Sequence, residues 1–145
     1  QTMENIGFIY SIGAAITWGL IYAIDQKVLA SISPIALLFI DSIITAIMVL
    51  PFIFFNGDSI QTILNSGKTN ISLIVTSVVL AALANFFIFS GIKLLGASSA
   101  SIIEIAYPFF VVLFSFILFK ATPNIYFFIG GLLIFLGSIV IIKFA

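Results

Sequence analysis

Long stretches without a charged residue set the strongest limit on how this chain folds. Residues 5–24, 69–92 and 121–142 contain no Asp, Glu, Lys or Arg. Each stretch matches the roughly 20 residues that an α-helix needs to cross the hydrocarbon of a bilayer. Two further stretches, 28–57 and 94–119, are interrupted by one acidic residue each. The sequence therefore predicts five membrane spans.

The composition places these spans in a bilayer rather than in a soluble core. Only 7% of the residues are charged and 63% are hydrophobic, whereas roughly one-quarter of an ordinary soluble domain is charged. The mean hydropathy of +1.38 excludes a water-soluble monomer, so a lipid bilayer is the expected surrounding. We expect an all-α membrane protein with a single five-span domain over residues 1–145. The spans are predicted at residues 6–25, 34–55, 71–92, 97–119 and 124–143.

Missing residue types exclude several classes of function. The charged residues are five Lys and five acids, so the formal net charge is zero and no basic patch is available to bind nucleic acid. The chain has no Cys and no His, which are the usual ligands of zinc, haem and iron-sulfur clusters. We therefore expect no metal site, no cofactor and no Ser/His or Cys/His nucleophile pair. An enzyme is not expected.

Local signals mark where helices begin and end. Ser33 before Pro34 and Thr122 before Pro123 each place a capping oxygen and a proline at a predicted helix start. Gly96 marks the turn between the third and fourth spans. The polar stretch 56–70 is the one connection long enough to be a real loop, so consecutive spans should be antiparallel neighbours.

The first span carries a stripe of small residues at every fourth position. Its members are Gly7, Ser11, Ala15 and Gly19, and such a stripe lets another helix backbone approach closely. We interpret it as a packing seam. A hinge or sliding surface is the alternative, and the sequence does not separate the two.

Counting residues from the membrane interface places two acids at one depth. Asp41 lies seven residues after Pro34, and Glu104 lies seven residues after Ala97. Because five alternating spans put both of these helix starts on the same side, each acid lies on the order of 10 Å below that interface. The same count adds polar and aromatic residues from all the first four spans: Trp18, Tyr22, Thr45, Asn85, Ser101 and Tyr107.

Glu104 is the strongest candidate for a functional group. Ionisable residues inside a membrane normally face the bundle interior or a water-filled cavity. Pro108, four residues later, removes the hydrogen bond to the Glu104 carbonyl, and Ser101 and Tyr107 fall on the same helix face. Such a carboxyl group can hold a proton in one state and pair with a cation in another. The alternative is a permanently protonated Glu104 that donates a hydrogen bond between helices.

The other candidates have structural alternatives of comparable weight. Asp41 has few polar neighbours and can equally be a protonated structural residue. Trp18 and Tyr22 are typical of interface anchors or packing as well as of ligand contacts. For Asn85, a structural role and a binding role have equal weight. Two carboxyl groups also leave open an intramembrane aspartyl hydrolase, although the sequence shows no path by which water would reach them. The lack of Arg and of Lys within spans disfavours phosphorylated substrates, so we expect a cationic, zwitterionic or neutral solute.

Five motifs in sequential order resemble the EamA domain of the drug/metabolite transporter superfamily. They are Gly13 to Gly19 with its Trp-Gly pair, Ser33-Pro34, the turn and Ala/Ser-rich stretch 90–101, Tyr107-Pro108, and Gly130-Gly131 with Gly137. The resemblance covers nearly the whole chain. Two positions depart from it, because a basic residue often stands where this chain has Asp41 and an acid where it has Lys120.

The resemblance implies a membrane transporter of small metabolites, often an exporter, in a prokaryotic cytoplasmic membrane. It also implies ten helices arranged as two inverted five-helix repeats, of which this chain supplies one. Because five is odd, the second repeat must insert upside down, as an antiparallel homodimer, a partner chain or a missing half. Lys27, Lys93 and Lys143 lie on one side against two lysines on the other, so the lysine bias leaves the orientation open.

Three hypotheses follow from the sequence. The first is a transporter or exchanger of a small solute, with proton coupling through Glu104. The second is a non-transporting accessory or assembly subunit whose acids are structural. The third is one half of a ten-helix transporter.

Overall fold

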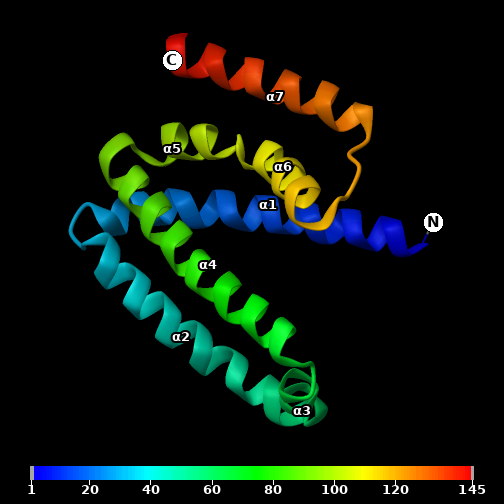
Figure 1. The fold of residues 1–145 in the computed structure, drawn as a ribbon. Helices are drawn as coiled ribbons and strands as arrows, with labels where there is room; N and C mark the ends of the chain where they lie inside the picture. Colours follow the sequence, from blue (N-terminus) through cyan, green and yellow to red (C-terminus); the bar gives the residue numbers. More distant parts are fainter. Residues whose placement is uncertain (1, 145) are drawn as a thin grey trace. The chain divides into compact units, whose positions relative to one another are not determined.

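The computed structural model describes residues 2–144 as a succession of helices (Figure 1). No strand occurs within this range. The helices are α1 (Thr2–Leu29), α2 (Pro34–Phe55), α3 (Asp58–Leu64), α4 (Lys68–Leu95), α5 (Ala97–Glu104), α6 (Tyr107–Phe119) and α7 (Ile125–Phe144). The predicted all-α fold class is confirmed.

Five segments are long and apolar enough to cross a membrane. They are α1, α2, α4, α7 and the 23 residues Ala97–Phe119, in which α5 and α6 follow one another. The helices α1 and α4 extend beyond the predicted ranges 6–25 and 71–92. Those ranges were limited by charged residues, but no Pro or Gly follows Asp25 before Leu29, so the backbone ladder continues.

The predicted loop 56–70 contains a short helix, so the loop prediction is wrong in part. α3 covers Asp58–Leu64 and ends at Asn65, whose N–H bonds to the carbonyl of Gln61 at 2.9 Å. Ile60, Ile63 and Leu64 recur at helical spacing and are exposed. This amphipathic spacing explains why α3 forms, although the polar composition of residues 56–70 favoured a loop.

The helix starts and turns are mostly as predicted. The Ser33 side chain accepts the Ala36 N–H at 3.2 Å, and Pro34 is the first residue of α2. Gly96 separates α4 from α5 with a φ of 84°, a conformation that favours glycine. The predicted cap at Thr122 is wrong, because α7 begins at Ile125. Asn124 supplies the capping oxygen there, accepting the Tyr126 N–H at 3.1 Å.

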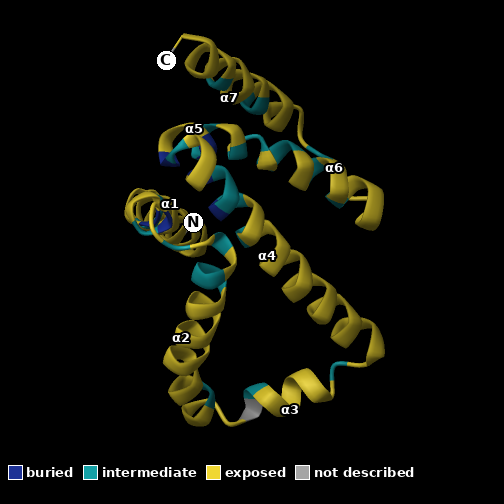
Figure 2. Ribbon diagram, turned by 90° about the vertical axis from the view of Figure 1, so that its left-hand side faces the viewer, coloured by how far each residue is buried: buried dark blue, intermediate teal, exposed yellow. Residues whose placement is uncertain are grey.

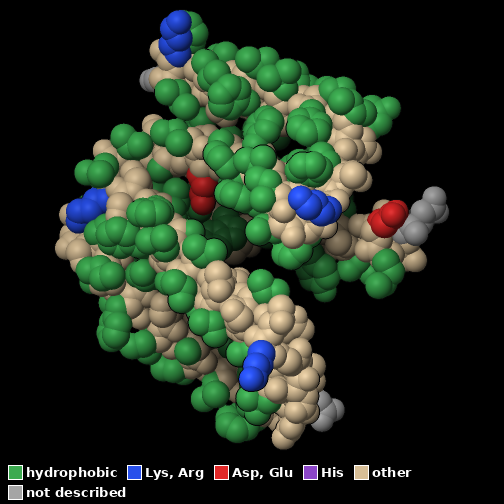
Figure 3. Space-filling model, in the orientation of Figure 1, with side chains coloured by type: hydrophobic (Ala, Val, Ile, Leu, Met, Phe, Trp, Pro, Cys, Tyr) green, Lys and Arg blue, Asp and Glu red, His purple; other side chains and the backbone are tan. Residues whose placement is uncertain are grey.

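Large apolar side chains cover the outside of the helices. Figure 2 shows that most of the described residues are exposed, and Figure 3 shows hydrophobic side chains over much of one face with few charged ones. Phe54, Phe55 and Leu118 are each more than 60% exposed. Apolar surface on this scale is stable in lipid and not in water.

Several hydroxyl groups within the spans are satisfied by their own helices. Thr17 and Ser42 each donate a hydrogen bond of 2.7 Å to the carbonyl four residues earlier, which satisfies a hydroxyl without water. The glycines of the small-residue stripe, Gly7 and Gly19, have open space around them. The stripe therefore makes no packing seam at these positions within the described part of the chain.

The chain divides into two compact units, which we describe separately. The first unit is Gln1–Lys27 with Gly91–Ala145, and the second is Val28–Ser90. In the first unit, Ile92, Ala97 and Ala100 are buried. A Cβ at Gly91 would lie 3.7 Å from the Ala100 Cβ, so small residues allow the end of α4 and the start of α5 to pack closely.

Candidate functional site

The fourth span is broken next to its acidic residue. α5 ends at Glu104 and α6 begins at Tyr107. Pro108 has no N–H to donate to the Glu104 carbonyl, and its ring crowds that carbonyl. At the break, the Ala106 N–H bonds to the carbonyl of Ile103 at 3.3 Å, three residues back instead of four. The span is therefore interrupted next to Pro108, and the Glu104 carbonyl loses its usual helical partner.

A hydrogen bond joins the Glu104 side chain to α1. The Tyr22 hydroxyl lies 2.6 Å from Glu104 Oε2 and donates to it. Both side chains are half-buried, so the carboxyl group is neither sealed in a core nor fully open. A bond this short between a phenol and a carboxyl group is typical of a strong hydrogen bond.

Trp18 extends this contact along α1. Its ring centroid lies 5.6 Å from that of Tyr22, with an interplanar angle of 58°, an arrangement that aromatic pairs favour. Trp18 and Tyr22 lie one helical turn apart, so both project from the same face of α1. We refer to Trp18, Tyr22 and Glu104 as the Glu104 cluster. All three residues were candidates from the sequence, and the structure brings them together.

Two residues near the Glu104 cluster were not among the candidates. Gln26, one turn after Tyr22, accepts the Ala97 N–H with its Oε1 at 2.6 Å, and so fixes the start of α5 against α1. Asp25 is buried, with 8% of its surface exposed. The first span was predicted to end at residue 25, so Gln26 lay outside it and Asp25 marked its charged end. The available signal was their helical spacing from Tyr22.

Ser101 and Tyr107 lie on the two sides of the break, and their part in the site stays a prediction. The Ser101 hydroxyl donates to the carbonyl of Ser98 at 3.0 Å, within its own helix. Tyr107 is the first residue of α6 and is 61% exposed. Ser101 lies three residues before Glu104 within α5, so the two residues share a face of that helix. Tyr107 lies beyond the interruption, so it no longer follows the helical phase of α5.

Asp41 and Asn85 belong to the second unit. Asp41 lies on α2 and is exposed, and Asn85 lies on α4 and is half-buried. Each lies within an apolar span, as expected from the sequence. Their participation in a site with Glu104 stays a prediction.

The Glu104 cluster offers chemistry of a particular kind. A carboxyl group and a phenol can both hold and pass a proton, and the carboxylate form can pair with a cation. The aromatic rings of Trp18 and Tyr22 present faces that attract a cation. Among residues 2–144, no group of three potential metal ligands is close together. The arrangement can therefore exchange a proton or a small cation at one carboxyl group.

A family model matches most of the chain. The model of the EamA-like transporter family matches residues 5–143, a range that includes all or nearly all of each of the five spans. No curated protein and no solved structure matches the chain.

Proposed function

The chain belongs to the EamA-like transporter family, and from this premise we propose that it exchanges a small solute for protons at Glu104. The family assignment supports an integral membrane transporter. The solute, the coupling ion and the site residues belong to the proposal. So do the single five-span domain over residues 1–145 and a location in a prokaryotic cytoplasmic membrane.

The observation that carries the proposal is the Tyr22–Glu104 hydrogen bond at a break in the fourth span. A carboxyl group at membrane depth either keeps its proton or pairs with a cation. Here the Tyr22 hydroxyl occupies one oxygen of Glu104 at 2.6 Å, and the interruption before Tyr107 gives the span a point at which it can bend. An incoming cationic group can replace the phenol, and a proton can later replace the cationic group.

The residues available favour one class of solute. The chain has no Arg, and the five apolar spans hold Lys only at their ends. Phosphate groups need such cationic partners. A carboxyl group beside two aromatic rings instead suits an amine or another small cation, and a zwitterionic or neutral solute remains compatible.

The proposal includes a second five-helix repeat. Five spans place the two ends of a repeat on opposite sides of the membrane, so an equivalent second repeat must be inverted. We propose an antiparallel homodimer as the arrangement. The open surroundings of Gly7 and Gly19 on α1 give a partner helix room to approach.

Solute-dependent proton flux tests this function. Purified chain is placed in proteoliposomes that contain a pH-sensitive dye and is challenged with amines, amino acids and sugars. We expect a solute-dependent proton signal that Glu104→Gln abolishes. Glu4→Gln is the matched control, because Glu4 is exposed in the first turn of α1, and it should leave the signal unchanged. A signal that persists in Glu104→Gln contradicts coupling at this residue.

The hydrogen bond itself favours a second candidate, an accessory subunit with a structural Glu104. A protonated carboxyl group that joins α1 to α5 would hold the helices together without moving a solute. In that case Glu104→Gln lowers folding yield or association, and no solute gives a flux in any variant. If the chain is one half of a ten-helix transporter, flux appears only when the other half is supplied.

A further inference from the structure

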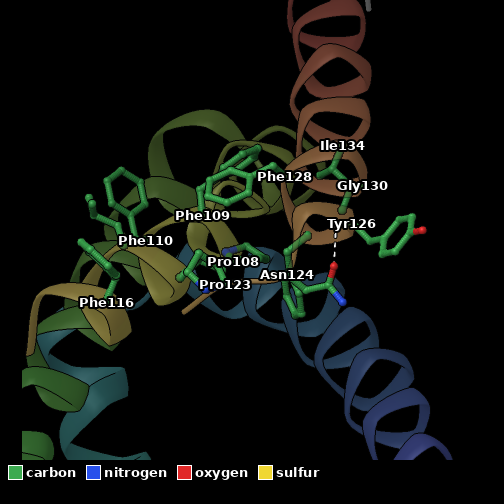
Figure 4. A pocket seen from close by; sticks show the side chains of 14 residues that line it. Pro108, Phe109, Phe110, Phe116, Pro123, Asn124, Tyr126, Phe128, Gly130 and Ile134 are labelled. Atoms are coloured by element: carbon green, nitrogen blue, oxygen red, sulfur yellow. Dashed lines mark hydrogen bonds between the residues drawn. The ribbon is translucent and has the colours of Figure 1, made fainter. Parts of the chain in front are cut away.

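A large apolar groove lies between α6 and α7, apart from the Glu104 cluster. Its volume is about 850 Å³. Among its lining residues are Phe109, Val112, Phe116, Pro123, Phe128 and Ile134, and we call this space the α6–α7 groove. Figure 4 shows the labelled side chains gathered around it from both helices.

The α6–α7 groove is narrow at the end near the start of α6, which we call its inner end. Its opposite, outer end reaches the loop that precedes α7. At the inner end, Phe109 contacts the backbone of α7, because a Cβ at Gly131 would lie 2.8 Å from Phe109 Cζ. Phe109 also packs edge-on against Phe135, with ring centroids 6.2 Å apart. At the outer end the lining includes Pro123 and Asn124, which lie just before α7.

The length of the groove matches one leaflet of a bilayer. The ten residues of α7 from Ile125 to Ile134 span about 15 Å of helix. The hydrocarbon core of a bilayer is about 30 Å thick, so about 15 Å corresponds to half of it. The groove therefore runs from the interface to roughly the middle of the membrane.

A cation and an amide mark the interfacial end. Lys120 Nζ lies 6.0 Å from the ring centroid of Phe116, which lines the groove. The Asn124 Oδ1 accepts the Tyr126 N–H, and the amide nitrogen of Asn124 points away from that bond (Figure 4). An ammonium group beside a ring that lines an apolar groove complements an anionic headgroup with a hydrocarbon chain.

We propose that the α6–α7 groove binds an acyl chain of an anionic phospholipid, whose phosphate pairs with Lys120. The groove suits an acyl chain better than a helix of a second copy. A helix of a second copy that followed the groove across the membrane would have to continue past the Phe109–Gly131 contact, whereas an acyl chain can end there. The bilayer already solvates acyl chains, so headgroup selectivity comes from Lys120.

Native mass spectrometry of the full chain tests the proposal. The protein is released from bilayers with equal amounts of phosphatidylglycerol and phosphatidylcholine, and the retained lipids are counted. We expect about fivefold more phosphatidylglycerol, from the contribution of one lysine near an anionic surface. Lys120→Gln should bring the ratio near one. Lys143→Gln is the matched control, because Lys143 Nζ also lies over a ring, 5.6 Å from the Phe144 centroid, but away from the groove.

A second pair of variants fills the groove without changing charge. A Cβ at Gly130 meets nothing within 4 Å, and Gly130 lines the groove. Gly130→Leu should therefore reduce retention of both lipids severalfold. Gly137→Leu, on the same helix with equally open surroundings but outside the groove, should retain lipid like the parent chain.

Two results would overturn the proposal. One is an unchanged lipid ratio in Lys120→Gln, which adds no bulk and changes an exposed residue. The other is unchanged lipid retention in Gly130→Leu. If that variant instead shifts the dimer to monomer, the groove is an interface between copies of the chain.

Discussion

Tyr22 and Glu104 lie 82 positions apart in the chain, yet their side chains share a hydrogen bond of 2.6 Å. A bond of this kind has few competitors in lipid, because water cannot replace either partner. It gives the Glu104 carboxyl a defined position relative to Trp18. At the scale of single residues, the proposed exchange therefore depends on one phenol and one carboxyl group.

Replacing Tyr22 by Phe tests the strength of this bond. The substitution keeps the ring and removes the donor, and the unpaired carboxyl group should cost about 1 to 3 kcal/mol of stability. Thermal unfolding in detergent measures the change. Tyr10→Phe is the control on the same helix, because Tyr10 is 75% exposed. Equal melting temperatures for the two variants would mean that the Tyr22–Glu104 bond contributes nothing.

At the scale of elements, two prolines lie within spans and have different consequences. α2 continues through Pro51 to Phe55, whereas the fourth span is interrupted just before Pro108. Pro51 lies in the last turns of α2, so only a short piece of helix remains after it. Pro108 lies near the middle of its span, where a break can change the direction of the second half of the span.

Pro108→Ala should strengthen the span and impair transport. It restores an N–H for the Glu104 carbonyl, and interior proline costs a helix up to about 3 kcal/mol. We therefore expect a higher melting temperature and a solute flux reduced severalfold in proteoliposomes. Pro51→Ala restores a similar bond on α2 and should leave flux unchanged. Full flux in Pro108→Ala would show that the break is not needed for transport.

Packing between α6 and α7 depends on the lack of a side chain at Gly131. A Cβ there would lie 2.8 Å from Phe109 Cζ, so Gly131→Ala should destabilise the protein by about 1 kcal/mol or more. Gly130→Ala, with nothing within 4 Å, should be neutral or stabilising. Combining Gly131→Ala with Phe109→Leu should recover the loss in a thermal-unfolding cycle. Without recovery, Phe109 is not the residue that restricts Gly131.

Helix existence was predictable from the sequence, but the rotation of each helix was not. The intervals between charges located five spans, and Ser33 and Gly96 marked boundaries correctly. Depth along a span follows from residue counting, so Tyr22 and Glu104 were assigned the same level. Which face each presents depends on packing between helices, and this is why Tyr22 could not be identified as the partner of Glu104. Gln26 was missed because the first span was predicted to end at the charged residue Asp25, whereas α1 continues to Leu29.

At the scale of the whole molecule, five spans require a partner with inverted orientation if two equivalent repeats are to pair. The five lysines divide three to two between the two sides when the spans alternate. This division gives only a weak orientation signal. The lysine distribution therefore leaves the orientation of the chain open.

Single cysteines test the orientation cleanly, because the native chain has no Cys. Ser31 and Asn65 are exposed, and alternating spans place their connections on opposite sides of the membrane. Ser31→Cys and Asn65→Cys each introduce one thiol at these positions. For an antiparallel homodimer, a membrane-impermeant thiol reagent added outside cells should label roughly half of each variant. Labelling of one variant only would contradict the homodimer and require a separate inverted partner.

Carbodiimide labelling tests the central claim, exchange of solute and proton at Glu104, most directly. Carbodiimides modify protonated carboxyl groups in apolar surroundings, and peptide mass spectrometry locates the modified residue. We expect the carbodiimide to label Glu104, and a solute active in the flux assay to reduce this labelling in a concentration-dependent way. The solute should not change the labelling of Glu4. Labelling of Glu104 that the transported solute does not change would contradict the claim.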